Sequence, residues 1–415
     1  MKLPSVPGRL DWVQAAALVL ACGVAGAAEL AVEDFAFDGA LGSEGAVIER
    51  LDTNHFKVTL GHAPGHPDWA NMVQFRILRH ASGNALRLDV VFHGGSTYRF
   101  NDYSYSWSYD NVEWQPVHWQ NKTTDSSVGD TLLFPTFAQD TVYVGHQVPM
   151  PYEMVDELVH RYEADPDVTL HVMGQSRGGR NLYRLEITDA DSPPPRTARW
   201  VHYFANQHPG EHNAQWRMVG MIDWLLSDAG ADCRRRSICH FVLMSSPDAP
   251  SHGWYRVCSE GVDMNRSYRV EGASAADQPH EAYVLQRDLE VLMASDTPAT
   301  DVWSMHTWQG IVEPIIEPGP EMGSALPEWT ALREAIEAND PDNLVKPLTA
   351  HYKGGNPTYW SNGPHLQFGI TSVLCEGGGA ICTKSENEAS GAALMKGIAQ
   401  YYEGTRTGTG KDERP

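Results

Sequence analysis

The chain has 415 residues, of which 42% are apolar, 10% are aromatic and 20% are charged. This composition excludes an intrinsically disordered protein and is sufficient for one large folded domain together with a smaller one. The formal net charge of −22 argues against nucleic acid as a partner, because phosphate binding requires a basic surface.

The first 28 residues have the pattern of an export signal. Lys2 and Arg9 give a positive start, the run from Val13 to Ala28 is apolar, and Ala25-Gly26-Ala27 provides the small residues of a cleavage site. We therefore expect a bacterial-type exported protein, periplasmic or secreted, with a lipoprotein anchored through Cys22 as the alternative. No later segment reaches about 18 consecutive apolar residues, which predicts a mature chain without a membrane span.

Six cysteines are present, and those after the export signal could be oxidised outside the cell. Cys233 and Cys239 are close enough in sequence to pair locally, as are Cys375 and Cys382, which would leave Cys258 free. Connectivity cannot be deduced from spacing, and buried thiols without any disulfide are an equally open interpretation.

Residues 29–150 have the pattern of an all-β domain. Short runs that alternate apolar and polar residues recur at His55–Leu60, Val73–Leu78 and Leu86–Phe92, and turn residues separate them. Such runs are typical of strands that bury one face in an antiparallel sandwich. The sequence therefore predicts a β-sandwich domain after the signal segment 1–28.

Residues 151–403 alternate between strand-like and helical segments, with a hairpin expected over His171–Thr188. This alternation indicates an α/β domain with a mixed sheet and helices on both faces. Residues 404–415 contain no apolar residue other than proline, which predicts a disordered tail. The expected strands are Trp200–Ala205, His240–Met244, Val302–Met305 and Ile370–Leu374, and the expected helices are Pro151–Glu163, Pro209–Ser227, Glu281–Met293 and Glu328–Glu337.

The strongest local signal is residues 206–211, which read Asn-Gln-His-Pro-Gly-Glu. The segment follows an expected strand, and Pro209 is expected to open a helix because proline suits the first helical turn. The i, i+3 spacing would place His208 and Glu211 on one side of that turn. Imidazole nitrogen and carboxylate oxygen are both zinc ligands, and a catalytic zinc site needs a third ligand from the protein.

Several other segments follow in a defined order along the chain. They are Gly174-Gln175-Ser176, Ser246-Pro247-Asp248, Tyr255-Arg256, the stretch from Gly261 to Arg266, Ser304-Met305-His306 and Cys375-Glu376. Together with His-Pro-Gly-Glu at 208–211, they resemble the zinc carboxypeptidase superfamily over residues 150–400, in particular its cytosolic carboxypeptidase-like branch. The β-rich segment 29–150 also resembles the domain that precedes the catalytic unit in this branch. The resemblance implies that residues 151–403 form a zinc carboxypeptidase catalytic domain.

The resemblance implies a zinc hydrolase with one Zn²⁺ per chain. His208, Glu211 and His306 would bind the ion and leave one position for water, whose pKa zinc lowers to about 7. Glu376 would act as the general base and then protonate the departing amine. Arg256 would stabilise the oxyanion that forms on the scissile carbonyl.

The resemblance also implies how such an enzyme would select a chain end. Arg266 and Asn265 would hold the terminal carboxylate of the substrate, because the guanidinium fork matches a carboxylate. Tyr359 would close over the substrate, and Asp263 would orient the His208 ring. The expected partners are therefore the C-termini of peptides or proteins, and peptidoglycan stem peptides are an alternative substrate for the same zinc chemistry.

The third-ligand segment departs from the family pattern. The family usually carries aspartate two residues before the histidine, where this chain has Ser304, and Thr307-Trp308 replaces the small or histidine residues more usual after it. The stretch between His306 and Glu376 also lacks an arginine that would match the basic residues of members that remove glutamate. The preference for C-terminal glutamate seen in those members is therefore not expected from this sequence, and the preferred C-terminal residue stays open.

Two other classes of protein fit parts of the sequence. Residues 174–178 fit the G-x-S-x-G nucleophile elbow around Ser176, and His93-Gly94-Gly95 resembles a lipase oxyanion loop, as in a serine esterase. The elbow needs a helix after the serine, whereas residues 181–187 alternate like a strand. A non-catalytic peptide-binding protein would fit the altered surroundings of His306, but such a protein has no need of Glu376 as a base.

Overall fold

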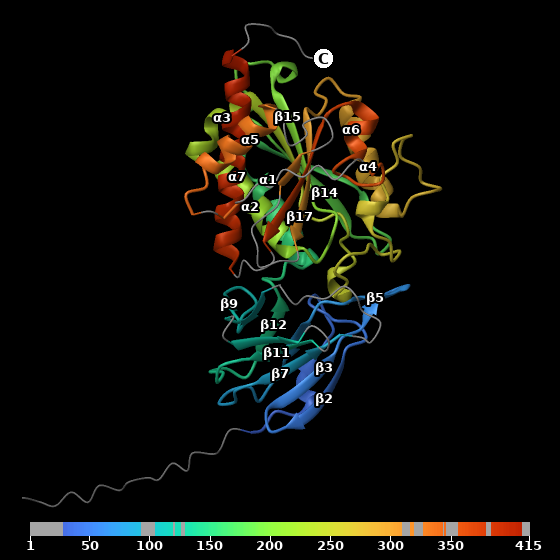
Figure 1. Cartoon of the computed structure of the whole chain (residues 1–415), viewed down its shortest axis with the longest axis vertical. Helices are drawn as coiled ribbons and strands as arrows, with labels where there is room; N and C mark the ends of the chain where they lie inside the picture. Colours follow the sequence, from blue (N-terminus) through green and yellow to red (C-terminus); the bar gives the residue numbers. More distant parts are fainter. Residues whose placement is uncertain are drawn as a thin grey trace, which may run out of the picture.

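A computed structural model describes residues 28–92, 104–118, 121–125, 129–308, 316–318, 327–342, 344–345, 356–378 and 383–408. Figure 1 shows a β-rich region built from the earlier part of the chain and, above it, a region in which helices surround a central sheet. Residues 1–27, which include Cys22 and all of the expected export signal except Ala28, lie outside the described residues. Among the described helices, none combines the length and the apolar content needed to cross a bilayer.

Within the part of the chain that the structure describes, the N-terminal region contains two five-stranded sheets that share one hydrophobic core. Apolar residues at alternate positions make that core: Phe56 and Val58 come from one sheet, and Phe75 and Ile77 from the other. The predicted β-rich character of this region is thus confirmed. The first sheet has the order β1 (Phe35–Ala36), β6 (Gln74–Ile77), β12 (Val142–His146), β8 (Tyr105–Ser108), β9 (Trp114–Pro116), and the second has β10 (Lys122–Asp125), β11 (Gly129–Leu133), β7 (Arg87–Val91), β3 (His55–Thr59), β2 (Val47–Asp52).

A short hairpin, β4 (His62–Ala63) and β5 (His66–Ala70), extends from this region toward the second one. The His66 imidazole contacts the Gly261 carbonyl oxygen at 2.7 Å, which links the hairpin to the later part of the chain. Backbone hydrogen bonds join the regions as well, including Met72 N–H to the Gly253 carbonyl at 2.7 Å. The two regions are therefore in direct contact.

A seven-stranded mixed sheet forms the centre of the second region within the described residues. Its central strands β16, β15, β17 and β19 are parallel, whereas β13, β14 and β18 pair antiparallel with their neighbours. This is the predicted mixed α/β sheet. The strand order is β13 (Val168–Gln175), β14 (Asn181–Ile187), β16 (Ser237–Val242), β15 (Trp200–Ala205), β17 (Asp301–Trp308), β19 (Thr371–Gly378), β18 (Ile316–Pro318).

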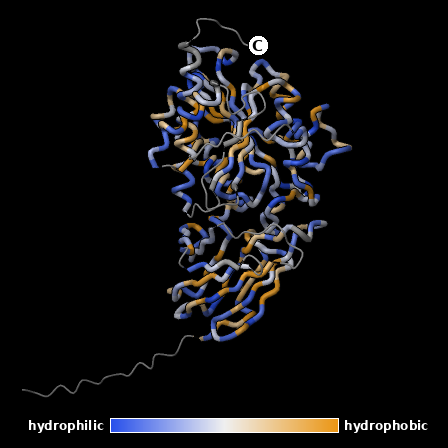
Figure 2. The backbone as a smooth tube through the Cα atoms, in the orientation of Figure 1, coloured by the Kyte–Doolittle hydropathy of each residue, from blue (hydrophilic) through white to orange (hydrophobic). Residues whose placement is uncertain are grey.

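Helices cover both faces of this sheet, because its strands alternate apolar side chains toward two separate cores. On β15, Phe204 belongs to one core, and Tyr203 and Ala205 belong to the other. Hydrophobic segments concentrate in the interior of the molecule (Figure 2). The first core contains residues of α1 (Tyr152–Glu163), α2 (His212–Leu226), α3 (Ala231–Arg236), α5 (Pro327–Ala338) and α7 (Lys384–Gly408), and α4 (His280–Met293) and α6 (Gly363–Phe368) pack on the second. Short 3₁₀ turns lie at Val32–Asp34, Arg196–Ala198, Asp228–Gly230, Pro250–His252 and Met264–Arg266.

One predicted helix has the wrong start, and one long helix is missing from the predictions. The helix expected from Pro209 begins instead at His212, because Pro209 and Gly210 form a turn that is held by other parts of the chain. Helix α7 was not predicted, and it continues to Gly408, through the first part of the segment expected to be disordered. Its Gly391 lies against the α2 backbone, where a Cβ would stand 1.9 Å from the Arg217 carbonyl oxygen. Close packing on α2 thus overrides the low helix propensity of glycine.

The cysteines described in the structure are buried and free. Cys233 and Cys239 lie in the same core, but no disulfide joins them, so the local pairing considered from the sequence is not made. Cys258 and Cys375 are likewise buried thiols. Cys382, the other candidate partner, lies outside the described residues.

Candidate metal centre and active site

The loop between β15 and α2 carries the first two predicted metal ligands. Glu211 N–H donates to the His208 carbonyl at 3.2 Å, and Gly210 N–H donates to the Tyr255 carbonyl at 2.9 Å. A Cβ on Gly210 would lie 2.6 Å from the Tyr255 ring and 2.7 Å from the Met72 sulfur, so only glycine fits there. The sequence predicted that His208 and Glu211 share one side of a first helical turn. In the structure they lie instead in a tight turn before the helix.

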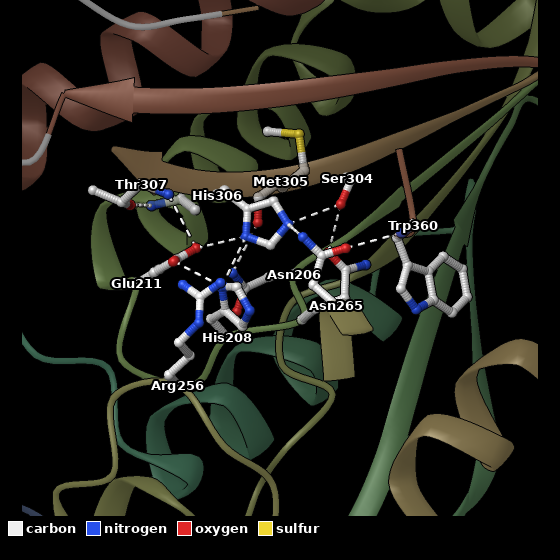
Figure 3. A network of polar contacts seen from close by, with 12 residues as sticks. Asn206, His208, Glu211, Arg256, Asn265, Ser304, Met305, His306, Thr307 and Trp360 are labelled. Carbon is white, nitrogen blue, oxygen red and sulfur yellow. Dashed lines mark hydrogen bonds and ion pairs between the residues drawn. The ribbon is translucent and has the colours of Figure 1, made fainter. Parts of the chain in front are cut away.

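Three side chains far apart in the sequence converge beyond this turn. His208 Nδ1 lies 2.8 Å from one Glu211 carboxylate oxygen, and His306 Nδ1 lies 2.8 Å from the other. The two Nδ1 atoms are 3.1 Å apart, and all three side chains are buried (Figure 3). Two imidazole nitrogens and a carboxylate oxygen are a donor set that suits zinc, and three protein ligands are typical of a catalytic zinc site. The predicted ligand residues are thus brought together.

Each imidazole is held by its other nitrogen. His208 Nε2 lies 2.9 Å from an Asp263 oxygen, and His306 Nε2 lies 2.8 Å from Ser304 Oγ. A neutral histidine that presents the Nδ1 lone pair to a metal carries its proton on Nε2, so the His208 ring would donate to Asp263. His306 Nε2 lies between Ser304 Oγ and the Asn265 amide nitrogen, which is 3.2 Å away. Ser304 Oγ in turn donates to Gln207 Oε1 at 2.8 Å. The serine that departs from the family pattern therefore still supplies an acceptor for His306.

The neighbours of the Glu211 and Asp263 carboxyl groups favour their ionised forms at neutral pH. Burial acts to raise the pKa of the Glu211 carboxyl, but the imidazoles of His208 and His306 outweigh it and hold that pKa well below its usual range. Burial is likewise outweighed at Asp263, whose pKa is held low by His208 and Arg256. Ligand carboxylates must be deprotonated to bind a metal, so this environment favours the binding form of Glu211.

Glu376 lies on the strand next to the one that carries His306. In the parallel pairing of β17 with β19, His306 is directly opposite Glu376, so both side chains project from the same face of the sheet. The next residue, Gly377, lies against the buried Arg217 guanidinium, where a Cβ would be 1.6 Å from a nitrogen. The backbone at Gly377 therefore approaches Arg217 closely, on the sheet face opposite Glu376.

Arg256 is linked to the cluster of His208, Glu211 and His306 by the Asp263 carboxylate. Its Nε donates to one Asp263 oxygen at 2.7 Å, while the other oxygen contacts His208. Asp263 therefore connects the predicted oxyanion residue to the first ligand, and Figure 3 shows the Arg256 side chain directed toward His208. Its side chain retains 15% exposure, so the guanidinium is not sealed from the site.

Asn265 and Arg266 lie in the 3₁₀ turn that follows Asp263. The Asn265 backbone N–H donates to Asp263 at 2.8 Å, and its side-chain oxygen accepts from the Trp360 N–H at 2.9 Å. The Arg266 guanidinium lies 3.9 Å from the centre of the Tyr359 ring, and its side chain is 41% exposed. The structure thus gathers the proposed carboxylate-binding residues and Tyr359 on one side of the metal cluster.

The serine of the candidate esterase motif has a structural role. Ser176 lies in the turn between strands β13 and β14, and no helix follows it. Its hydroxyl donates to Asp248 at 2.8 Å, and Asp248 also accepts from Gly178 N–H and from Arg180. A nucleophile elbow requires a strand followed by a helix, so this alternative does not fit the fold. His93-Gly94-Gly95 lies outside the described residues.

Burial of His212, the first residue of α2, predicts a pH dependence of stability. Loss of solvent lowers the pKa of its imidazole from 6.5 to about 4. The unfolded chain binds this proton below pH 6.5, whereas the folded chain does not until about pH 4, so the free energy of unfolding should fall as the pH drops through that window. The expected contribution is about 3 kcal/mol.

The measurement is denaturant unfolding of the zinc-free protein at pH 7 and pH 4.5, compared with a His212→Gln variant. Between pH 7 and pH 4.5, the free energy of unfolding should fall by about 2–3 kcal/mol less in the variant than in the parent. Equal losses in the two proteins would contradict the assignment of this pH dependence to His212.

Comparisons with known proteins agree with this arrangement. Residues 153–287 match the zinc carboxypeptidase family. The chain is 35% identical over 147 residues to cytosolic carboxypeptidase 2 of Danio rerio, and 29% identical over 174 residues to cytosolic carboxypeptidase 3 of Mus musculus. These segments cover 34% and 38% of this chain but only 20% and 17% of the relatives, so the chain spans about a fifth of their length.

Solved structures share the fold over most of the chain. A metallo-carboxypeptidase from Burkholderia cenocepacia has a TM-score of 0.73 at 19% identity, covering 89% of this chain and 99% of that one. A metallo-carboxypeptidase from Pseudomonas aeruginosa has a TM-score of 0.72 at 19% identity, covering 90% and 100%. Both overlaps are long enough to include the N-terminal β-rich region as well as the central sheet. The family match and the relatives show that residues 153–287 are similar to the zinc carboxypeptidase family, and the solved structures show the same fold over most of the chain.

Proposed function

We propose that this protein is a zinc-dependent carboxypeptidase that removes single residues from the C-termini of peptides. The observation that carries the proposal is the buried cluster of His208, Glu211 and His306, with Glu376 opposite His306 on the neighbouring strand. Structural zinc sites are closed by four protein ligands, whereas three side chains converge here among the described residues and Glu376 is not one of them.

His208, Glu211 and His306 would hold the ion. When bound, zinc supplies a Lewis acid that polarises a carbonyl and makes water nucleophilic near neutral pH. Glu376 would accept the proton from the attacking water and return it to the departing amine. Asp263 and Ser304 would keep the two imidazole rings in the orientation that presents Nδ1.

Arg256 would stabilise the negative charge that develops on the scissile carbonyl oxygen. Its Nε is already bound to Asp263 at 2.7 Å, so the guanidinium is held in place before substrate arrives. Donors positioned in advance toward a developing oxyanion contribute about 10²–10³-fold in rate. The shared Asp263 carboxylate keeps this donor in a fixed relation to the first metal ligand.

Arg266 would select a free chain end. Its guanidinium lies over the Tyr359 ring, and its high exposure leaves N–H groups available to a ligand. A substrate carboxylate matches the guanidinium fork, whereas an amidated terminus carries no charge to pair with it. Specificity for the terminus would therefore reside mainly in this residue.

Arg266→Ala should lower kcat/KM for peptides with a free C-terminus by about 10–10²-fold, mostly through KM, because a hydrogen-bonded charge pair is lost. Arg266→Lys should be intermediate, since it keeps the charge but not the fork. The measurement is steady-state hydrolysis of matched free and amidated peptides. If the wild-type protein cleaves both equally well, Arg266 is not a carboxylate clamp.

A comparison of inhibitors tests the proposed chemistry. A zinc chelator should abolish peptide hydrolysis, added zinc should restore it, and a serine-directed organophosphorus reagent should have no effect. Hydrolysis that survives complete zinc removal would overturn the proposal.

A further inference from the structure

Helix α2 begins directly after the metal-ligand turn, but its own N-cap side chain does not cap it. The N-cap residue is Glu211, which makes no side-chain capping hydrogen bond. Its carboxylate oxygens instead contact His208 and His306. The first backbone N–H groups of a helix need acceptors, and a short polar side chain at the N-cap position normally provides one. At this helix the usual capping group is committed to the metal cluster.

Two residues from other parts of the fold supply side-chain acceptors to these N–H groups, and the Ala214 N–H also donates to the Glu211 carbonyl at 3.0 Å. Gln147, which directly follows β12 of the N-terminal region, accepts the Asn213 N–H through Oε1 at 3.0 Å. Thr307, which follows His306 on β17, accepts the Ala214 N–H through Oγ1 at 3.1 Å. Asn213 and Ala214 are the second and third residues of α2, the positions that an N-cap side chain would serve.

Thr307 also holds the ligand itself. Its backbone N–H donates to a Glu211 carboxylate oxygen at 3.1 Å, so one residue contacts the carboxylate with its main chain and the helix start with its hydroxyl. Figure 3 shows Thr307 beside Glu211 at the edge of the cluster. Thr307, on the strand that carries the third ligand, therefore fixes both the Glu211 carboxylate and the start of α2.

Gln147 is held in an unusual conformation. The residue is fully buried, and its φ of 56° lies in the left-handed region that non-glycine residues adopt at an energetic cost. Its backbone N–H donates to the Ser104 carbonyl at 2.9 Å, which ties it to the N-terminal sheet. Such strain persists only where surrounding contacts enforce it, and it is often found at functional sites.

We propose that Gln147 and Thr307 are positioning residues that cap α2 in place of Glu211 and thereby hold the Glu211 carboxylate in its metal-binding orientation. The N-terminal β-rich region, through Gln147, would therefore help to position a metal ligand. The inference rests on the proposed zinc centre but not on the peptidase reaction, so zinc binding tests it separately from catalysis.

Thr307→Val removes the hydroxyl at nearly constant volume, and Thr307→Ser retains it. Outer contacts of metal ligands typically contribute about 10–10²-fold to metal affinity. We expect Thr307→Val to weaken zinc binding by that factor and Thr307→Ser to stay within about threefold of the parent. The measurement is competition for zinc against a chromogenic chelator, on protein shown to be folded by circular dichroism.

Gln147→Leu and Gln147→Glu form a second matched pair, because glutamate keeps an acceptor oxygen and leucine does not. Gln147→Leu should weaken zinc binding, and Gln147→Glu should largely preserve it. Amide hydrogen exchange adds a readout that a loss of global stability alone would not reproduce. Exchange at Asn213 should accelerate selectively in the leucine variant, because its N–H loses the Gln147 acceptor. Exchange at Ala214 should accelerate less in the valine variant, because that N–H also donates to the Glu211 carbonyl.

The outcomes separate this inference from the proposed function. If the parent binds zinc and the valine and leucine variants bind it equally well, the capping role is overturned while the zinc centre stands. If the parent binds no zinc, the proposed function and this inference both fail. Weaker binding in valine and leucine, with recovery in serine and glutamate, supports the inference.

Discussion

Replacement of Glu376 by glutamine should lower kcat by about 10²–10⁴-fold and leave zinc binding unchanged, because the amide cannot accept a proton. Glu376 stands opposite His306 in the β17–β19 register but is not one of the three converging ligands. Loss of the base therefore affects the reaction without removing a donor to the metal. Steady-state peptide hydrolysis and metal analysis of the purified variant measure the two effects separately.

A suitable control is Glu388→Gln, which removes a half-buried carboxylate on α7. Glu388 pairs with Lys384 in the same helix and takes no part in the cluster. This control should retain parental activity and zinc content. Parental turnover by Glu376→Gln would contradict the assignment of the base, and zinc loss in that variant would show that Glu376 supports the metal directly.

Replacement of Glu211 by glutamine should have the largest effect on zinc itself. One of its oxygens lies 2.8 Å from His208 and the other 2.8 Å from His306. The amide carries no negative charge and offers one acceptor oxygen instead of two. Since even outer contacts contribute about 10–10²-fold to metal affinity, zinc binding should weaken by more than about 10²-fold.

Glu281→Gln provides the matched control, because Glu281 is also fully buried but lies on α4, where it accepts a hydrogen bond from Ser259. Chelator competition on both variants distinguishes loss of a ligand from loss of a buried charge. The Glu281 variant should bind zinc like the parent. Parental zinc affinity in Glu211→Gln would remove Glu211 from the ligand set.

Much of the fold follows from local sequence patterns. The predicted bounds of the strand Trp200–Ala205 agree with the structure at both ends. The predicted bounds of the hairpin around Gly178-Gly179 and of helix His280–Met293 agree with the structure within a few residues. These elements have strong periodicity or clear turn residues, and their own side chains determine them. Helix α7 did not follow from its sequence, because its glycine-containing middle is stabilised by packing on α2.

The family resemblance of the ordered motifs predicted the site residues that lie close together in the structure. Periodicity and spacing alone indicated only His208 and Glu211 as candidate ligands. The helix start was misplaced because Pro209 suited a first helical turn, whereas Tyr255 and Met72 hold Gly210 in a separate turn. Gln147 gave no signal, and Thr307 stood out only as a departure from the family pattern. The capping contacts arise through the tertiary fold, 66 and 93 residues away in sequence from the amides that these residues contact. Contacts of this range have no local pattern.

The most direct test is mass spectrometry of a mixed peptide pool incubated with the protein, with and without a zinc chelator. The pool should include peptides with free and amidated C-termini and peptidoglycan stem peptides. The account predicts chelator-sensitive loss of single residues from free C-termini, and the products would also reveal the preferred side chain and substrate class. Intact free-C-terminus peptides after incubation with protein that contains stoichiometric zinc would contradict it.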